Sequence, residues 1–138
     1  AEANGISHLL HIRHGVNYDD LPVFYKLATA FVYPSRIEGF GIPMLEAITS
    51  GLPAIGCTGS CLEEAGGPTS LYVNPDDVEG MADAIHSVYN DVSLRQNMIA
   101  QGKEYARRFD IAKLTSDLYE VYKTVCGSHR GVGPNSLL

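Results

Sequence analysis

The sequence predicts an α/β fold with a parallel sheet of the doubly wound kind. Short apolar runs with strand-like flanks alternate with helical stretches, and their connections carry helix-start and helix-stop residues. Amphipathic helices then follow towards the end of the chain. The chain has 138 residues, which is the length of a single domain. Its composition, with 45% hydrophobic and 19% charged residues, is typical of a globular protein.

Charge and apolar patterning exclude two classes of function. Ten basic against sixteen acidic side chains give a net charge of -6. Proteins that bind nucleic acid through its phosphates need the opposite sign, so we expect no nucleic-acid partner. No apolar run approaches the ~20 residues of a membrane helix, so we expect no membrane span in this chain.

The cysteines and a run of histidines are expected to be structural or incidental. Cys57, Cys61 and Cys126 are an odd count without a framework spacing, which is typical of reduced thiols and predicts a cytoplasmic location. Cys57 and Cys61 have the spacing of half a metal site, but no second pair completes it. The three histidines of residues 8–14 lie in a predicted strand, where side chains alternate between faces. We therefore expect no metal site.

The first predicted elements are a short strand near Leu9 to His14 and a helix from about Asp20 to Ala28. Asp20 stands where a helix cap belongs, and Pro22 falls in the first turn, where its missing N–H costs nothing. Four side chains share one helix face: Leu21, Phe24, Tyr25 and Ala28.

The middle of the chain predicts a strand, a turn, a helix and a second strand. Ala30 to Tyr33 has the length and flanks of a strand buried on both faces. Pro43 suits the first helical position, and Gly51 suits the left-handed residue just past the helix end. Ala54 to Gly56 is the next buried strand. Ile37 to Gly41 is therefore a glycine-rich turn between a strand end and a helix start.

A short helix, a short strand and three longer helices complete the prediction. Ser60 and Glu63 form a capping box, Gly66-Gly67 end that helix, and Leu71 to Val73 is a strand. Residues 127–138 have no periodicity and are expected to be a flexible tail. The three amphipathic stripes are Val78, Met81, Ala82, Ile85, Val88 and Tyr89; Leu94, Met98, Tyr105 and Phe109; and Leu114, Leu118, Val121, Tyr122 and Val125.

The glycine-rich turn has the features of a phosphate site. Helix N-termini gather unpaired N–H groups and the positive end of the helix dipole. Gly39 and Gly41 remove side chains that would keep a phosphate from the backbone, at the sheet edge where ligands of such folds bind. Glu46 lies ~5–6 Å further along the helix axis, where a carboxylate can accept bonds from both ribose hydroxyls. Glu38, at the strand end, would reach whatever is attached beyond the phosphates.

Spacing alone leaves an alternative open, because glycine-proline turns are common and a glutamate such as Glu46 is usually solvated. A Rossmann dinucleotide fingerprint is not matched, since Met44 occupies the position of its third glycine.

Several segments together resemble the signature of retaining glycosyltransferases with the GT-B fold, the large fourth family of sequence-based classification. The mark of that family is two glutamates separated by seven residues, here Glu38 and Glu46. Similarity runs through roughly Ile6 to Val125 and includes the stretch from Cys61 to Asp76. The matching segments are Pro34-Ser35, Glu38-Gly39-Phe40-Gly41-Ile42-Pro43, Leu45-Glu46-Ala47 and Gly51-Leu52-Pro53.

The resemblance implies the C-terminal of two Rossmann-like domains, which binds a UDP- or GDP-linked sugar donor. Glu46 would hold the ribose hydroxyls, and Glu38 would be the catalytic residue beside the reacting carbon of the sugar. Leu45 would line the pocket or belong to the core. The turn would present its backbone to the diphosphate and sugar at Gly39, Phe40, Gly41 and Ile42. The sugar would be transferred with retention and without a metal, because helix dipole and basic residues replace the cation.

Two parts of the family pattern are not found in the sequence. No glycine-containing strand with an Arg/Lys pair that neutralises the diphosphate precedes His8. The N-terminal domain that would bind a glycan or lipid-linked acceptor is absent too. We therefore expect residues 1–126 to form an incomplete C-terminal nucleotide-sugar-binding domain that is inactive alone.

Three functions remain open at this point. They are a retaining glycosyltransferase domain of glycan or polysaccharide biosynthesis, a non-catalytic nucleotide-binding or interaction module, and a GT-B-like sugar-nucleotide epimerase. The intact Glu38 and Glu46 pair favours the first over the second, and the continuous match through Cys61 to Pro75 disfavours the third. That loop somewhat resembles mannosyltransferase-type members, while sucrose- and trehalose-type synthases share the same motif.

Overall fold

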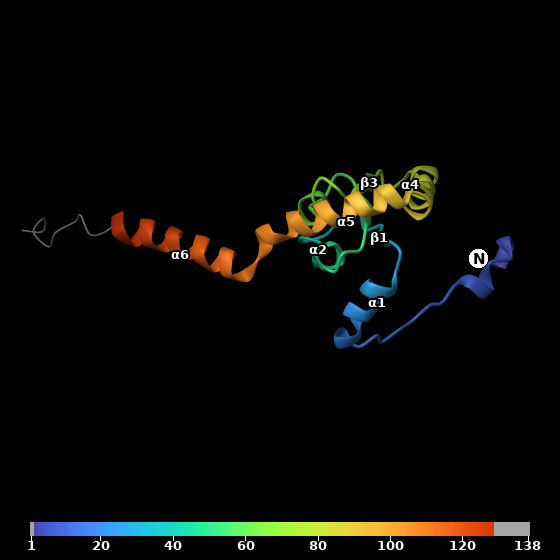
Figure 1. Ribbon diagram of the computed structural model, residues 1–138, viewed down its shortest axis with the longest axis horizontal. Coiled ribbons are helices and arrows are strands. Elements are labelled where there is room, and N and C mark those ends of the chain that lie inside the picture. The colour runs from blue at the N-terminus through green and yellow to red at the C-terminus, as the bar shows by residue number, and fades with distance from the viewer. Residues whose placement is uncertain (1, 129–138) are drawn as a thin grey trace, which may run out of the picture.

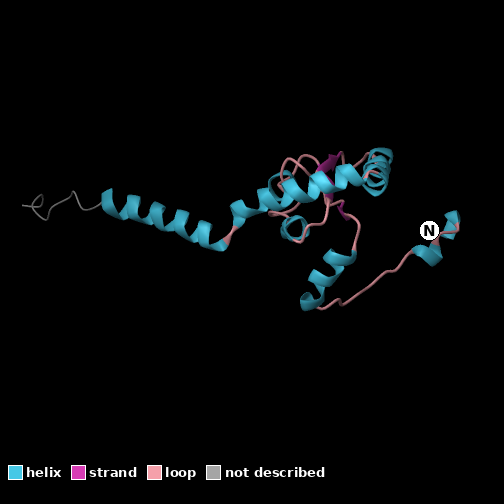
Figure 2. Ribbon diagram, viewed as in Figure 1, coloured by secondary structure: helices cyan, strands magenta, loops and turns pink. Residues whose placement is uncertain are grey.

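The computed structural model describes residues 2–128. Its helices surround a three-stranded parallel sheet in the order β1-β2-β3, which confirms the predicted α/β class (Figures 1 and 2). The helices and strands are α1 (Leu21–Leu27), β1 (Phe31–Tyr33), α2 (Ile42–Thr49), β2 (Ala54–Cys57), α3 (Leu62–Gly66), β3 (Leu71–Val73), α4 (Val78–Asn90), α5 (Val92–Ala106) and α6 (Ile111–Ser128).

The central strand β2 divides the core into two parts. Ala54 lies in a buried cluster with Met44 of α2 and Leu62 of α3, whereas Ile55 lies in a second cluster with Val88 of α4 and Met98 of α5. Consecutive side chains of a strand point to opposite faces, so the two clusters lie on opposite faces of the sheet. The predicted burial of β2 is confirmed along its whole length.

Strand β1 is only partly buried, which corrects the prediction of burial on both faces. It pairs with β2 through Phe31 opposite Ala54 and lies at the edge of the three-stranded sheet. An edge strand has a neighbour on one side alone, so the apolar composition of β1 overstated its burial.

The predicted strand near Leu9 to His14 is wrong. Ser7–Leu9 form a 3-10 turn, and an irregular segment follows it. In Figure 1 this part of the chain lies away from the α/β core. Leu9 and Ile12 are both 68% exposed. A strand needs a second backbone to pair with, and within residues 2–128 none lies beside this segment.

Helix α1 begins as predicted, with Pro22 in its first turn, but its predicted cap is wrong. The Asp20 side chain makes no capping hydrogen bond. The chain enters α1 through a 3-10 turn, Tyr18–Asp20, and Asn17 caps that turn by accepting the Asp19 N–H at 3.3 Å. The extra turn moves the capping position upstream of Asp20.

The ends of α2 and α3 follow their glycines. Gly51, with φ of 81°, lies just past α2, and Gly67, with φ of 69°, ends α3. The predicted capping pair of α3 does form hydrogen bonds, but each side chain accepts the N–H one residue before the predicted one. Ser60 Oγ accepts the Leu62 N–H at 3.3 Å, and Glu63 Oε1 accepts the N–H of the residue before Ser60 at 3.1 Å.

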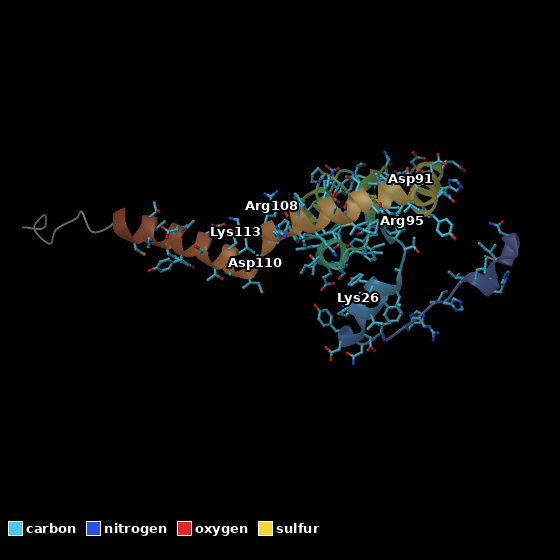
Figure 3. All side chains as sticks on the ribbon, viewed as in Figure 1. Lys26, Asp91, Arg95, Arg108, Asp110 and Lys113 are labelled. Carbon is cyan, nitrogen blue, oxygen red and sulfur yellow. The ribbon has the colours of Figure 1, made fainter. Side chains whose placement is uncertain are left out.

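The joint between α4 and α5 is fixed by polar side chains (Figure 3). Asp91 caps α5 by accepting the Leu94 N–H at 2.8 Å, and Arg95 donates to the Val88 carbonyl at 2.7 Å. The predicted stripe of α4 is buried only in part, because Val88 is fully buried while Val78 is 77% exposed.

Helix α6 extends away from the α/β core (Figure 1). Asp110, at its start in Figure 3, caps it by accepting the N–H groups of Ala112 at 2.9 Å and Lys113 at 3.3 Å. The first two residues of the predicted tail belong to α6, and the rest of that tail lies outside the described residues. The predicted apolar stripe is exposed throughout: Leu114, Leu118, Val121, Tyr122 and Val125. Among the described helices, none has the length and apolarity to cross a membrane.

Candidate functional site

The glycine-rich turn joins the end of β1 to the start of α2. Gly41 has a φ of 97°, and a Cβ built there would lie 2.6 Å from Leu62 Cδ2, so the fold itself requires glycine at this position. A Cβ on Gly39 would have no neighbour within 4 Å.

Helix α2 starts at Ile42 without a side-chain cap. Pro43 has no N–H, and the Met44 N–H donates to the Gly41 carbonyl at 2.9 Å. The start of α2 therefore offers an anion the Ile42 N–H and the positive end of the helix dipole.

Glu46 lies one turn into α2 and is engaged at both carboxylate oxygens. Tyr18 Oη donates to Glu46 Oε1 at 2.9 Å, and Tyr25 Oη donates to Glu46 Oε2 at 3.0 Å. Burial and this hydrogen bond raise the pKa of Tyr25 to about 12, and the hydrogen bond to Glu46 raises the pKa of Tyr18. Both hydroxyls therefore remain protonated donors at neutral pH, and Glu46 is not simply solvated.

Glu38 is held in a similar way at the start of the turn. Tyr33 Oη donates to Glu38 Oε1 at 2.7 Å, and the Cys61 thiol donates to the Glu38 carbonyl at 3.1 Å. The hydroxyls of Ser35 and Tyr33 lower the pKa of the Glu38 carboxyl. Glu38 is therefore a carboxylate at neutral pH, with a fixed orientation.

A row of aromatic rings links Tyr25, which holds Glu46, to Tyr33, which holds Glu38. The Tyr25 ring meets Phe31 edge-on at 5.7 Å between centroids, and Phe31 stacks on Tyr33 at 5.7 Å. This row runs from α1 into β1. It gives both tyrosine hydroxyls a common rigid support beneath the site.

The Phe40 side chain attaches the glycine-rich turn to the 3-10 turn Arg107–Phe109, which follows α5. Its ring meets Phe109 edge-on at 5.5 Å, and Phe109 meets Tyr105 at 5.8 Å. The Arg108 guanidinium, at the junction of α5 and α6 in Figure 3, lies 5.1 Å from the Tyr105 ring centre. The ring of Phe40 is thus used for packing.

Two adjoining cavities lie along α2, and Leu45 and Thr49 line both of them. The smaller, of about 280 Å³, has Tyr25 and Glu46 in its wall. The larger, of about 620 Å³, extends along α5 past Lys103. Leu45 also packs against the buried cluster around Met44, so it belongs to both a cavity wall and the core.

Positive charge and metal ligands are sparse around the turn. Arg36 is paired with Asp76 at 2.5 Å, and this hydrogen bond raises the pKa of Arg36. Both side chains are exposed. Across residues 2–128, no three histidine, cysteine, aspartate or glutamate side chains are grouped as metal ligands would be.

The family model for group 1 glycosyl transferases matches residues 1–105. This chain belongs to that family. Among curated relatives, O-antigen chain mannosyltransferase B of Escherichia coli is 36% identical over 105 residues, which are 76% of this chain and 28% of that protein. Phosphatidyl-myo-inositol mannosyltransferase of Mycolicibacterium smegmatis is 28% identical over 123 residues, 86% of this chain and 32% of that protein. This chain thus spans about a third or less of the length of these relatives.

The fold of this group 1 glycosyl transferase also matches a solved structure. Sucrose-phosphate synthase from Thermosynechococcus elongatus aligns with a TM-score of 0.80 over 92% of this chain and 33% of that one, at 23% identity. The likeness shows the fold, which is that of a GT-B C-terminal domain. It agrees with the resemblance inferred from the glutamate pair and its flanking segments.

The structure places all the sequence-predicted site residues on one continuous stretch, the turn and the first turn of α2: Glu38, Gly39, Phe40, Gly41, Ile42, Leu45 and Glu46. Sequence reasoning did not assign Tyr18, Tyr25 or Tyr33 to the site. Tyr25 was placed on a helix face, and nothing in the local pattern of Tyr18 or Tyr33 marks a glutamate partner. Those contacts are visible only in three dimensions.

Proposed function

We propose that this chain binds the nucleoside diphosphate sugar donor, UDP- or GDP-linked, of a retaining glycosyltransferase. One observation carries the proposal. Glu46 lies in the wall of a cavity, one turn from the uncapped start of α2. That arrangement offers a carboxylate to a ribose and a helix start to the adjoining diphosphate.

Each predicted site residue has a role in this proposal. Glu46 accepts the ribose hydroxyls, and Leu45 lines the pocket beside it. The backbone of the turn meets the diphosphate and sugar along Gly39, Phe40, Gly41 and Ile42. Glu38 lies beside the reacting carbon of the sugar. Its lowered pKa keeps it ionised, so it stabilises the positive charge that this carbon gains as the leaving group departs.

The reaction exchanges one bond of the sugar for another. The bond from the anomeric carbon to the diphosphate oxygen breaks, and the nucleoside diphosphate leaves with the electron pair. An acceptor hydroxyl bonds to the same face of the carbon and gives its proton to the departing diphosphate, so the configuration is retained. The dipole at the start of α2 stabilises the leaving diphosphate, and we propose that no metal ion takes part.

The acceptor is proposed to bind outside this chain. The chain spans 28% of the E. coli mannosyltransferase, and we assign a glycan or lipid-linked acceptor to an N-terminal domain of the whole protein. The names of several relatives favour mannose as the sugar, and the O-antigen chain in two of these names favours polysaccharide biosynthesis. The free cysteines favour the cytoplasm as the location. On this proposal the 138 residues alone bind the donor without turning it over.

Nucleotide titration tests the proposal. UDP, GDP and ADP are titrated by ligand-observed NMR against the wild-type chain, Glu46→Ala, and the matched control Glu79→Ala, an exposed glutamate of α4. We expect UDP or GDP to bind with a dissociation constant of about 1 mM or lower, which corresponds to a binding free energy of about 4 kcal/mol or more. Glu46→Ala should lose this binding, and Glu79→Ala should keep it. Binding by neither UDP nor GDP, or binding that survives Glu46→Ala, would overturn the proposal.

A further inference from the structure

The two tyrosines on Glu46 lie in different surroundings. Tyr25 is half-buried on α1, its ring rests against Phe31, and it shares the wall of the 280 Å³ cavity with Glu46. Tyr18 is 70% exposed on the 3-10 turn that precedes α1. One hydroxyl therefore comes from the interior side of the carboxylate and the other from the solvent side.

The strength of support differs between the two hydroxyls as well. Phe31, and Tyr33 behind it, hold the Tyr25 ring in place. Tyr18 sits on a turn closed by exposed hydrogen bonds between Asn17 and the two residues after Tyr18. Losing one exposed hydrogen bond to water costs little, so a ligand displaces Tyr18 easily and Tyr25 with difficulty.

Tyrosine hydroxyls already engage both carboxylate oxygens of Glu46, so a ribose that binds there must displace one hydroxyl or share an oxygen with it. The two ribose hydroxyls donate to the carboxylate, and a carboxylate binds best when its plane is fixed in advance. The Tyr25 hydrogen bond to Oε2 fixes that plane. The Tyr18 hydroxyl already occupies Oε1 with the kind of hydrogen bond that a ribose hydroxyl would make.

We propose that Tyr25 is a positioning residue for Glu46, and that the Tyr18 hydroxyl occupies the ribose position on Glu46 until the donor displaces it. This inference rests on the proposed function, in which Glu46 binds the ribose. It assigns opposite effects to two tyrosines that hold the same side chain.

Paired nucleotides separate this role from a general structural one. Dissociation constants are measured for GDP, UDP and their 2′,3′-dideoxy analogues, with the wild-type chain, Tyr25→Phe, Tyr18→Phe and Tyr119→Phe. Tyr119 is an exposed tyrosine of α6 and serves as the matched control. Phenylalanine keeps each ring and removes only the hydroxyl. The dideoxy analogues lack the groups that Glu46 would bind.

Opposite shifts are expected for the ribonucleotide that binds. Tyr25→Phe should weaken it about three- to tenfold, and Tyr18→Phe should strengthen it about two- to threefold, the scale of single hydrogen bonds. Neither variant should change the affinity for the dideoxy analogue, and Tyr119→Phe should change nothing. Equal weakening of both nucleotides by Tyr25→Phe would show a structural role and overturn the inference. Weaker ribonucleotide binding by Tyr18→Phe would overturn it too, because Tyr18 would then be a ligand contact.

Glu46→Ala distinguishes failure of this inference from failure of the proposed function. If Glu46→Ala weakens the ribonucleotide and Tyr25→Phe does not, the tyrosine assignment alone is wrong. If Glu46→Ala leaves the affinity unchanged, or the wild-type chain binds neither diphosphate, the proposed function fails and this inference fails with it. The unfolding midpoint of Tyr25→Phe is measured to show that this variant is folded. Tyr18 is exposed, so Tyr18→Phe tests the displacement of its hydroxyl without disturbing the core.

Discussion

The Tyr33 hydroxyl donates to Glu38 Oε1 at 2.7 Å, which ties the last residue of β1 to a carboxylate five positions later in the turn. The orientation of Glu38 is therefore set by the sheet and not by the turn alone. Because Tyr33 stacks on Phe31, the same strand that positions Glu38 also supports the ring of Tyr25.

Removing the Tyr33 hydroxyl should raise the pKa of Glu38. Ser35 and Tyr33 hold this pKa below its ordinary value of 4.5, and Tyr33→Phe deletes one of the two donors. A depressed folded-state pKa adds stability that is present above the unfolded-state value and is lost as the pH falls through the folded-state value. Tyr33→Phe should therefore lose less stability on acidification than the wild type. Carboxyl ¹³C titration by NMR measures the shift, with Tyr119→Phe as control, and an unchanged or lower midpoint would contradict it.

Two glycines of the turn should respond differently to alanine. At Gly41 the left-handed backbone and the approach of Leu62 make Gly41→Ala costly, by about 2 kcal/mol or more. Gly39→Ala enters open space and should change the unfolding free energy by less than about 0.5 kcal/mol. Urea unfolding of the two variants makes the comparison, and equal losses would refute the account of Gly41.

Phe40 and Phe109 should be energetically coupled. Their edge-on rings, 5.5 Å apart, connect the glycine-rich turn to the 3-10 turn Arg107–Phe109 after α5. A double-mutant cycle with alanine should give a coupling of about 0.5–1.5 kcal/mol in unfolding free energy. The control cycle pairs Phe40 with Phe24 of α1, with which it shares no ring contact in the described part of the chain, and should give a value near zero. Similar values in both cycles would mean that the ring contact contributes nothing specific.

Tyr72 should make the protein sensitive to alkali. Its hydroxyl donates to the Gly67 carbonyl at 2.8 Å, and burial raises its pKa to about 12 from the ordinary 10.0. A raised folded-state pKa gives stability that is full below pH 10 and is lost as the pH rises towards 12. Tyr72→Phe should cost about 1 kcal/mol at neutral pH, because the buried Gly67 carbonyl then keeps only the longer hydrogen bond from the Ser70 N–H at 3.4 Å.

Unfolding in urea at pH 7 and pH 11 measures both effects of Tyr72. The drop between these two pH values should be smaller in Tyr72→Phe than in the wild type. It should not vanish, because Tyr25 also has a pKa raised to about 12. A variant that loses as much stability as the wild type would show that Tyr72 is not the source.

Local backbone signals predicted the site-bearing part of the fold. Pro43 fixes its own φ, and Gly51 and Gly67 permit the left-handed φ that ends a helix, so the start of α2 and the ends of α2 and α3 could be predicted from single residues. The turn that carries Glu38 and Gly41 followed from those boundaries.

Features that depend on distant partners were not predictable. The run near Leu9 to His14 has an apolar pattern, but strand formation depends on a neighbouring backbone that the pattern does not contain. The same reason applies to Phe24, which the pattern placed on one helix face with Leu21 and Tyr25 and which is 51% exposed. The tyrosine partners of Glu46 are 28 and 21 residues away in sequence, beyond the reach of any local spacing rule.

The connection from β1 through α2 to β2 carries the turn, both glutamates and the residues that start and stop α2 on one uninterrupted stretch of chain. Such a stretch can be moved between scaffolds as one continuous insert, with the flanking strands as its ends. The tyrosines that hold Glu46 lie upstream at Tyr18 and Tyr25. A graft of this site onto another α/β scaffold must therefore begin at about residue 17 and run to Pro53, since a shorter insert would transfer Glu46 without the hydroxyls that orient it.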